Sequence, residues 1–127
     1  MFSEMLLDHF QRPRNVGELA EATARVDVSN PVCGDVLRLA VRVEGGRIRE
    51  VKFLCRGCTT AIACASLATE KMQGIEVASL GKITAKAVAE ALSGLPEASF
   101  HGAQLAEDAV KAIVDALGEA DSSLRSE

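Results

Sequence analysis

The stretch that decides the fold covers residues 35–54 and reads DVLRLAVRVEGGRIREVKFL. Its first half alternates apolar and polar side chains, which is the period of a strand with one buried face and one solvent face. The apolar members are Leu37, Leu39, Val41 and Val43. Gly45 and Gly46 then supply the positive φ angles of a tight turn. We therefore predict an antiparallel hairpin built from residues 35–43 and 48–54.

Strand patterns come first in the chain and helical patterns follow. A short amphipathic helix over residues 3–11 is expected to place Met5, Leu6, His9 and Phe10 on one face, and a further strand is expected over 24–29. From Cys58 onward the apolar period changes from two to 3.6 residues. Helices are predicted over 59–74, 84–93 and from His101 to Gly118. This order predicts an α+β domain whose helices pack on one face of an antiparallel sheet.

Length and composition restrict the classes of function that the protein can have. A chain of 127 residues is expected to form one domain, which we place at residues 1–118, with 119–127 as a flexible C-terminal tail. The net charge of −4 and the scattered basic residues exclude a nucleic-acid partner, and no apolar run reaches the ~20 residues of a membrane span. Four cysteines without a signal-peptide pattern predict a cytoplasmic protein with reduced thiols.

Thiol, imidazole and carboxylate groups at segment boundaries are the candidates for chemistry. Cys33 lies in the turn sequence NPVCGD, and Cys58 precedes a helix whose positive dipole end would stabilise a thiolate. Asp35 follows the first cysteine by two residues, and His101 begins the last helix. These four residues form a metal site if the fold brings positions 33, 58 and 101 together. Each of these residues could also have a purely structural role, as a small apolar residue, a turn cap or the first residue of a helix.

The other cysteines and the other histidine have simpler interpretations. Cys55 and Cys58 form a C-x-x-C pair, but here the second cysteine occupies the helix start, whereas in a thioredoxin-type redox site the first one does. Cys64 shares the apolar stripe of its helix and is predicted to pack in the core, with a reserve role as a ligand. His9 is predicted to be a hydrogen-bonded core histidine.

Four motifs, in this order, resemble the IscU/NifU/SufU family of iron–sulfur cluster scaffold proteins. The resemblance covers nearly the whole chain. Its motifs are SEMLLDHF at 3–10 with PRNVG at 13–17, NPVCGD at 30–35, Gly57-Cys58 with Ala61-Ile62-Ala63, and His101 with LAEDA at 105–109.

The resemblance implies a fold, a ligand set and partners. The fold would be an α+β domain with a three-stranded antiparallel sheet. Cys33, Asp35, Cys58 and His101 would hold iron or a transient [2Fe-2S] cluster, with zinc as the occupant in preparations made in air. A cysteine desulfurase would supply sulfur, and apo iron–sulfur proteins would receive the cluster.

The chain departs from the family pattern at two places. The scaffolds usually carry a third cysteine directly after the histidine, where this chain has Gly102. Sulfur relay would then need Cys64 or Cys55 as a substitute. The segment Leu95–Ser99 also differs from the Leu-Pro-Pro-Val-Lys that the dedicated chaperone recognises in IscU-type members.

Three functions are therefore weighed. The first is a non-enzymatic scaffold that assembles a cluster and passes it on. The second is a zinc-bound sulfur acceptor, a sulfurtransferase accessory to the desulfurase. The third is a structural or regulatory module that keeps the fold without cluster chemistry.

Overall fold

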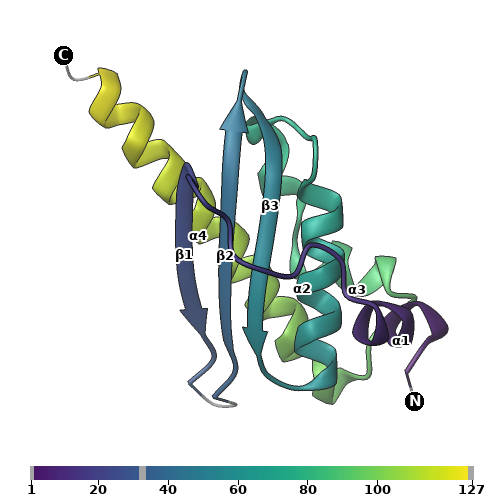
Figure 1. Cartoon of the computed structure of the whole chain (residues 1–127). Helices are drawn as coiled ribbons and strands as arrows, with labels where there is room; N and C mark the ends of the chain where they lie inside the picture. The colour runs from purple at the N-terminus through teal and green to yellow at the C-terminus, as the bar shows by residue number, and fades with distance from the viewer. Residues whose placement is uncertain (1, 32–33, 126–127) are drawn as a thin grey trace.

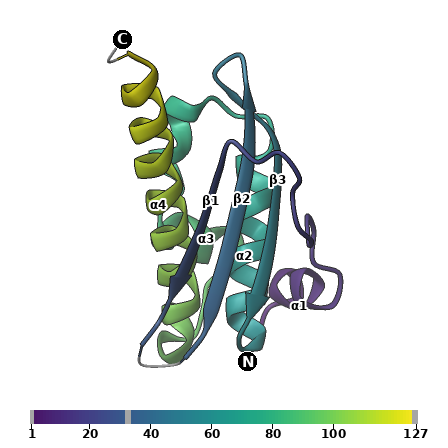
Figure 2. The same cartoon turned by 60° about the vertical axis from the view of Figure 1, so that its left-hand side comes forward.

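Three antiparallel strands in the order β1-β2-β3 form the sheet in this computed structural model, which describes residues 2–31 and 34–125. The strands are β1 (Ala24–Ser29), β2 (Val36–Glu44) and β3 (Arg47–Arg56). The helices α2 (Thr59–Met72), α3 (Ala85–Ala91) and α4 (Phe100–Arg125) lie on one side of this sheet (Figures 1 and 2). The predicted fold class is confirmed.

The hairpin forms where the alternating pattern predicts it. Gly45 and Gly46 adopt φ angles of 59° and 77° in the turn between β2 and β3. A register shift between Arg42 and Val43 interrupts the pairing near that turn. The predicted inward residues Leu37, Leu39 and Val41 are buried, which fixes the register because a slip of one residue would expose all of them.

Capping residues set the starts of two helices. In α1 (Glu4–Gln11), Ser3 Oγ accepts a hydrogen bond of 3.1 Å from the backbone N–H of Leu6. Thr84 Oγ1 accepts from the backbone N–H of Ala87 in the same way at the start of α3. Two 3-10 helices, η1 (Val77–Lys82) and η2 (Glu97–Ser99), were not predicted, since short 3-10 turns have no apolar period to detect.

Two predictions about the helices are wrong. The last helix does not end at Gly118 but continues to Arg125, because a helix tolerates glycine at a cost of only ~1 kcal/mol. On α1, Leu6 and His9 are buried, but Met5 and Phe10 are 45% and 36% exposed, so the buried face is narrower than the pattern predicts.

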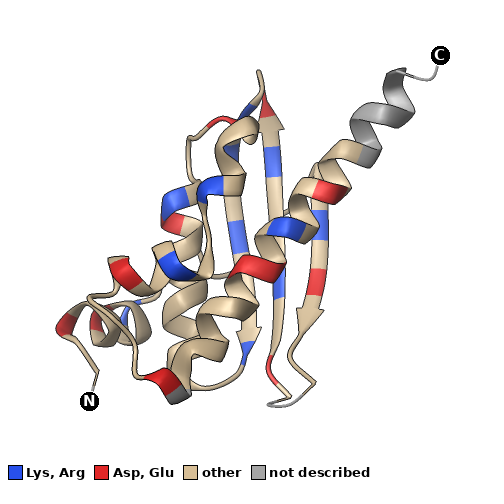
Figure 3. Ribbon diagram, turned by 180° about the vertical axis from the view of Figure 1, so that it is seen from behind, with Lys and Arg blue, Asp and Glu red and all other residues tan. Residues whose placement is uncertain are grey.

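Within the described residues, no helix combines the length and apolar content needed to cross a bilayer. On the helical face, acidic and basic residues are interspersed (Figure 3).

The predicted core histidine joins α1 to α2. His9 is 1% exposed, and its Nδ1 lies 2.8 Å from Ser66 Oγ on α2. Ser66 Oγ also accepts a hydrogen bond of 2.9 Å from the backbone N–H of Arg14. The Glu70 carboxylate, with Oε1 3.5 Å from Nε2, favours the tautomer with its proton on Nε2, in which Nδ1 accepts from the Ser66 hydroxyl.

Acid should destabilise the protein through His9. Burial is the main cause that lowers the pKa of His9 below 6.5, and the charge of Arg14 lowers it further, against Glu70 and Asp8. The unfolded chain then binds a proton near pH 6.5 that the folded protein does not yet bind, so stability falls as the pH drops through this range. The His9 contribution to the slope is at most about 1.4 kcal/mol per pH unit.

Urea unfolding of metal-free protein at about pH 7.5 and about pH 5.5 tests this expectation. His9→Gln should lose stability at the higher pH and show a smaller loss on acidification than the wild type. An unchanged pH dependence in the variant would show that other groups cause the acid sensitivity.

Candidate metal centre

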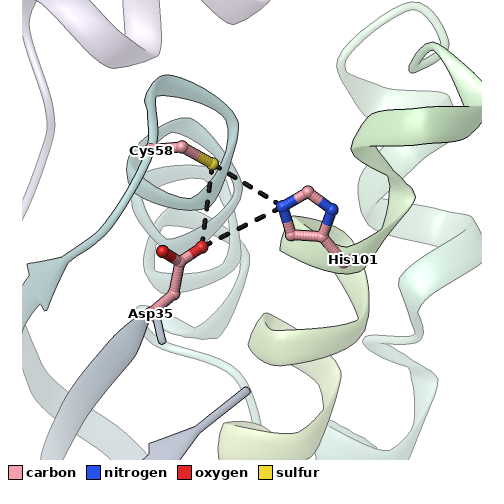
Figure 4. A group of neighbouring side chains, drawn as sticks. All are labelled: Asp35, Cys58 and His101. Atoms are coloured by element: carbon pink, nitrogen blue, oxygen red, sulfur yellow. Dashed lines mark hydrogen bonds and ion pairs between the residues drawn. The ribbon is translucent and has the colours of Figure 1, made fainter. Parts of the chain in front are cut away.

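The candidate site lies at the end of the sheet where β1 ends, β2 begins and β3 gives way to α2. Asp35 directly precedes β2, Cys58 directly precedes α2, and His101 is the second residue of α4. Figure 4 shows the three side chains pointing toward one another from these three segments. Their ligand atoms all lie within 4.8 Å of one another. Three segments that are distant in the sequence therefore meet at one point.

Backbone hydrogen bonds in the β1–β2 connection hold Asp35 in place. The backbone N–H of Asn30 donates to the carbonyl of Asp35 over 2.9 Å, and the N–H of Gly34 donates to the carbonyl of Asn30 over 2.7 Å. Gly34 has a φ angle of 76°, which a glycine adopts without strain. The residue Asp35 is 7% exposed, so its carboxylate has little contact with water.

Cys58 is the N-cap residue of α2, yet its side chain does not cap the helix. Its backbone is extended, with φ −76° and ψ 171°, and its side chain makes no capping hydrogen bond. Instead, Sγ lies 3.7 Å from Asp35 Oδ2 and 3.7 Å from His101 Nε2. The thiol at the positive end of the helix dipole is thus directed at two other metal-ligating groups.

The spacing of the three donor atoms fits a single ion. Besides the two distances of 3.7 Å from the sulfur, His101 Nε2 lies 4.0 Å from Asp35 Oδ2. A tetrahedral ion with bonds of about 2.0–2.3 Å separates its ligand atoms by about 3.3–3.8 Å. Small movements of the side chains would bring all three donors into the first coordination sphere of one metal.

The site is open on one side. Cys58 is exposed and the His101 side chain is 31% exposed, whereas the Asp35 side chain is only 10% exposed. The three described donors account for three positions around a tetrahedral ion, and the fourth remains for Cys33, which lies outside the described residues, or for an exogenous ligand. The arrangement therefore suits a metal group that must enter and leave.

The structure brings together three of the four predicted ligands. Asp35, Cys58 and His101 converge, and Cys33 lies outside the described residues. Metal binding by the four residues stays a prediction.

Neither remaining cysteine has the properties of the missing third thiolate. Cys64 is fully buried in the core, as predicted, and burial raises the pKa of its thiol to about 12. Cys55 is half-buried, and burial is also the main cause that raises its pKa, to about 11. A buried neutral thiol is a poor ligand and a poor nucleophile. The burial of Cys64 stands against its reserve role as a ligand, which stays a prediction.

The close approaches at two glycines beside the candidate ligands were not predicted from the sequence. Gly57 precedes Cys58 and lies against the Asp35 carboxylate, and Gly102 follows His101 and lies against the first turn of α2. Neither has a positive φ angle. The signal available in the sequence was a glycine next to a candidate ligand at a position where no turn requires glycine.

Comparison with known proteins agrees with the fold and the motifs. The NifU-like N terminal domain family matches residues 1–121, and the chain belongs to this family. The iron–sulfur cluster assembly scaffold protein IscU 1 of Archaeoglobus fulgidus is 47% identical over 116 residues, covering 91% of this chain and 76% of that protein. The scaffold protein IscU of Azotobacter vinelandii is 44% identical over 117 residues, covering 89% of this chain and 91% of its own length.

A solved structure supports the fold. The N-terminal region of a NifU-like protein from Brucella abortus superposes with a TM-score of 0.64, covering 98% of this chain and 94% of that one. Its sequence identity of 16% makes this a likeness of fold alone.

Alkylation should distinguish the three described thiols. At about pH 8, iodoacetamide should modify Cys58 first, because it is exposed, and should modify Cys55 and Cys64 much more slowly, because their raised pKa values leave little thiolate. Peptide mass spectrometry of native and urea-unfolded protein measures this order. Rapid labelling of Cys64 in the native protein would contradict the packing described above.

Proposed function

We propose that this protein is a scaffold on which an iron–sulfur cluster is assembled and from which it is passed to apoproteins. The observation that carries the proposal is the convergence of Asp35, Cys58 and His101 at an exposed edge, in a chain whose relatives include proteins named as IscU scaffolds. The cluster is the cargo of this activity. A carrier must bind the cluster and release it again. We propose no catalytic acid or base in this protein.

The proposed ligand set is Cys33, Asp35, Cys58 and His101. Cys33 precedes Asp35 by two residues in the sequence. A set of two sulfur, one oxygen and one nitrogen donor suits tetrahedral zinc and can hold iron. Because a carboxylate oxygen is a harder donor than a thiolate, a cluster held in this way is bound less tightly than one held by three thiolates. Weak binding favours transfer.

The partners follow from the chemistry of the cargo. A cysteine desulfurase would supply sulfur as a persulfide, an electron donor would reduce it to sulfide, and apo iron–sulfur proteins would accept the completed [2Fe-2S] cluster. The exposed thiol of Cys58 is accessible to both. The cytoplasm, which keeps thiols reduced, would be the compartment of this exchange.

Anaerobic reconstitution tests the scaffold function. Incubation with ferrous iron, cysteine, a thiol reductant and a cysteine desulfurase should give visible sulfide-to-iron charge-transfer absorption that survives desalting. After an apo-ferredoxin is added and the two proteins are separated, the absorption should be found with the ferredoxin. A colourless protein from which the iron washes away would contradict the proposal.

The ligand set has its own test in zinc affinity, measured by competition with a chromophoric chelator. Cys58→Ser and Asp35→Asn should each weaken binding by at least about 100-fold, since even changes outside the coordination sphere cost about 10- to 100-fold. Cys64→Ala removes a buried thiol from the same helix as a matched control, and its affinity should stay at the wild-type value. Equal affinities in all four proteins would place the zinc elsewhere.

A second candidate function is a zinc-bound sulfur acceptor that receives persulfide sulfur from the desulfurase. One observation favours it: Cys58 is the exposed thiol among the described cysteines. This function predicts faster desulfurase turnover in the presence of the zinc-loaded protein. The stimulation should vanish in Cys58→Ser and survive in Cys64→Ala, whereas a scaffold without sulfur acceptance should leave the turnover unchanged.

A further inference from the structure

The face of the sheet turned away from the helices, here called the open face, is uncovered beside the candidate site. Leu37, Leu39 and Val41 are buried beneath the helices, so the alternating residues of β2 lie on the open face. The chain between α1 and β1 crosses this face in front of β2 and β3 (Figure 1). Val36, at the start of β2, stays 39% exposed. A surface is therefore accessible directly next to Asp35.

A cavity of about 600 Å³ opens on this face. Val36 and Leu54 contribute apolar side chains to its lining, and Leu54 is 37% exposed. Arg56 contributes a basic side chain. In the sequence, Arg56 precedes Cys58 by two residues and Val36 directly follows Asp35. The cavity therefore adjoins two of the proposed ligands.

The sheet register places more basic than acidic residues on the open face. Up to the register shift at Arg42, residues that pair across the strands share a face, and residues two apart along a strand share it too. The basic residues of the open face are Arg25, Arg38, Arg42, Lys52 and Arg56, and the acidic ones are Asp27 and Glu50. The whole chain has the opposite balance, with 14 basic and 18 acidic residues. The open face is therefore a cationic patch on an acidic protein.

Ion pairs leave part of this positive charge available. Both acidic residues of the open face are already paired with arginines, at nitrogen–oxygen distances of 2.8 Å and 2.7 Å. Among the described residues, no carboxylate pairs with Lys52 or Arg56. These two cations can therefore pair with carboxylates of another protein.

A recipient of the cluster meets an anionic site and brings anionic ligands of its own. A Cys58 thiolate and the Asp35 carboxylate give the site negative charge, and a [2Fe-2S] cluster is typically held by four cysteine thiolates in its recipient. Each of these thiols must lose its proton to bind iron. A neighbouring arginine stabilises a thiolate, and Arg56 is placed to do so. A sulfur donor brings only one such group, so the cationic face favours the recipient more.

We propose that the open face is the docking surface for recipient proteins with an acidic surface, whose carboxylates pair with Arg56 and Lys52 while an apolar side chain enters the cavity at Leu54. This inference rests on the proposed scaffold function and names the chemistry of its recipients. Opposite charges speed the encounter of two proteins, and the apolar contact slows their separation. The acidic remainder of the chain repels the same partner and so directs it to this face.

Cluster transfer to a strongly acidic apo-ferredoxin tests this inference. The scaffold is loaded anaerobically with ferric iron, sulfide and a thiol reductant, so that no desulfurase takes part. Equal cluster content in each loaded variant, measured by visible absorption, separates docking from cluster binding. The variants are Arg56→Glu, Lys52→Glu and Leu54→Ala. Lys86→Glu is the matched control, because this exposed lysine lies on α3, on the helical side of the sheet, and its reversal changes the net charge equally.

The expected rates depend on the salt concentration. At about 20 mM salt, Arg56→Glu should slow transfer by about 10-fold, and Lys52→Glu by a smaller factor because Arg56 lines the cavity and is nearer to Cys58 in the chain. Lys86→Glu should keep the wild-type rate. At about 1 M salt the Debye length is about 3 Å, so the charge variants should approach the wild-type rate. Leu54→Ala removes apolar contact without charge and should slow transfer at both salt concentrations.

The outcomes separate this inference from the function on which it rests. If the loaded wild type transfers no cluster, the scaffold function fails and this inference fails with it. If the wild type transfers its cluster and Arg56→Glu and Lys52→Glu do so at the same rate, the docking surface alone is overturned. Equal slowing in Lys86→Glu would also overturn it, because net charge alone would then explain the effect. Slower assembly with a cysteine desulfurase but unchanged transfer would assign the face to the sulfur donor and contradict the proposal.

Discussion

The packing of the first turn of α4 against the first turn of α2 is the contact on which the candidate site depends. Cys58 and His101 are 43 residues apart in the chain, and each belongs to a different helix. The packing of the two helices against each other therefore sets the distance between the sulfur of Cys58 and the nitrogen of His101. The start of β2 contributes the third donor at the same end of the sheet (Figure 4). Ligands supported by regular elements are held more accurately than ligands on loops.

The composition of α2 makes this close packing feasible. The buried face of the helix consists largely of small side chains, among them Ala61, Ala65 and Ala68. Small residues let a helix axis come close to the sheet on one side and to α4 on the other. Large core side chains come from the neighbouring elements, with Phe53 on β3 and Ile113 on α4, and α2 itself adds Met72 at its end. The hydrogen bond between His9 and Ser66 then attaches α1 to the same central helix.

The site combines a firm base with an open face. Asp35 is buried and fixed by backbone hydrogen bonds, whereas Cys58 and His101 reach solvent. An ion or cluster bound there would rest on the protein on one side and face a partner protein on the other. The exposure of Cys58 and His101 gives an incoming ligand access to two of the three described donors, which is the property that a carrier requires.

The sequence by itself determined the hairpin, the three strands, the starts of the four α-helices and the core location of His9 and Cys64, because periodicity and capping are local properties. It also singled out Asp35, Cys58 and His101 as residues at segment boundaries. It could not detect η1, and it ended α4 at Gly118, since a single glycine signals a possible helix end without enforcing one. Only the tertiary structure decided that these three residues meet, that Cys55 is half-buried, and that Gly102 and Gly57 adjoin the site. These facts depend on distances between segments far apart in the chain, and such distances arise only when the helices pack on the sheet.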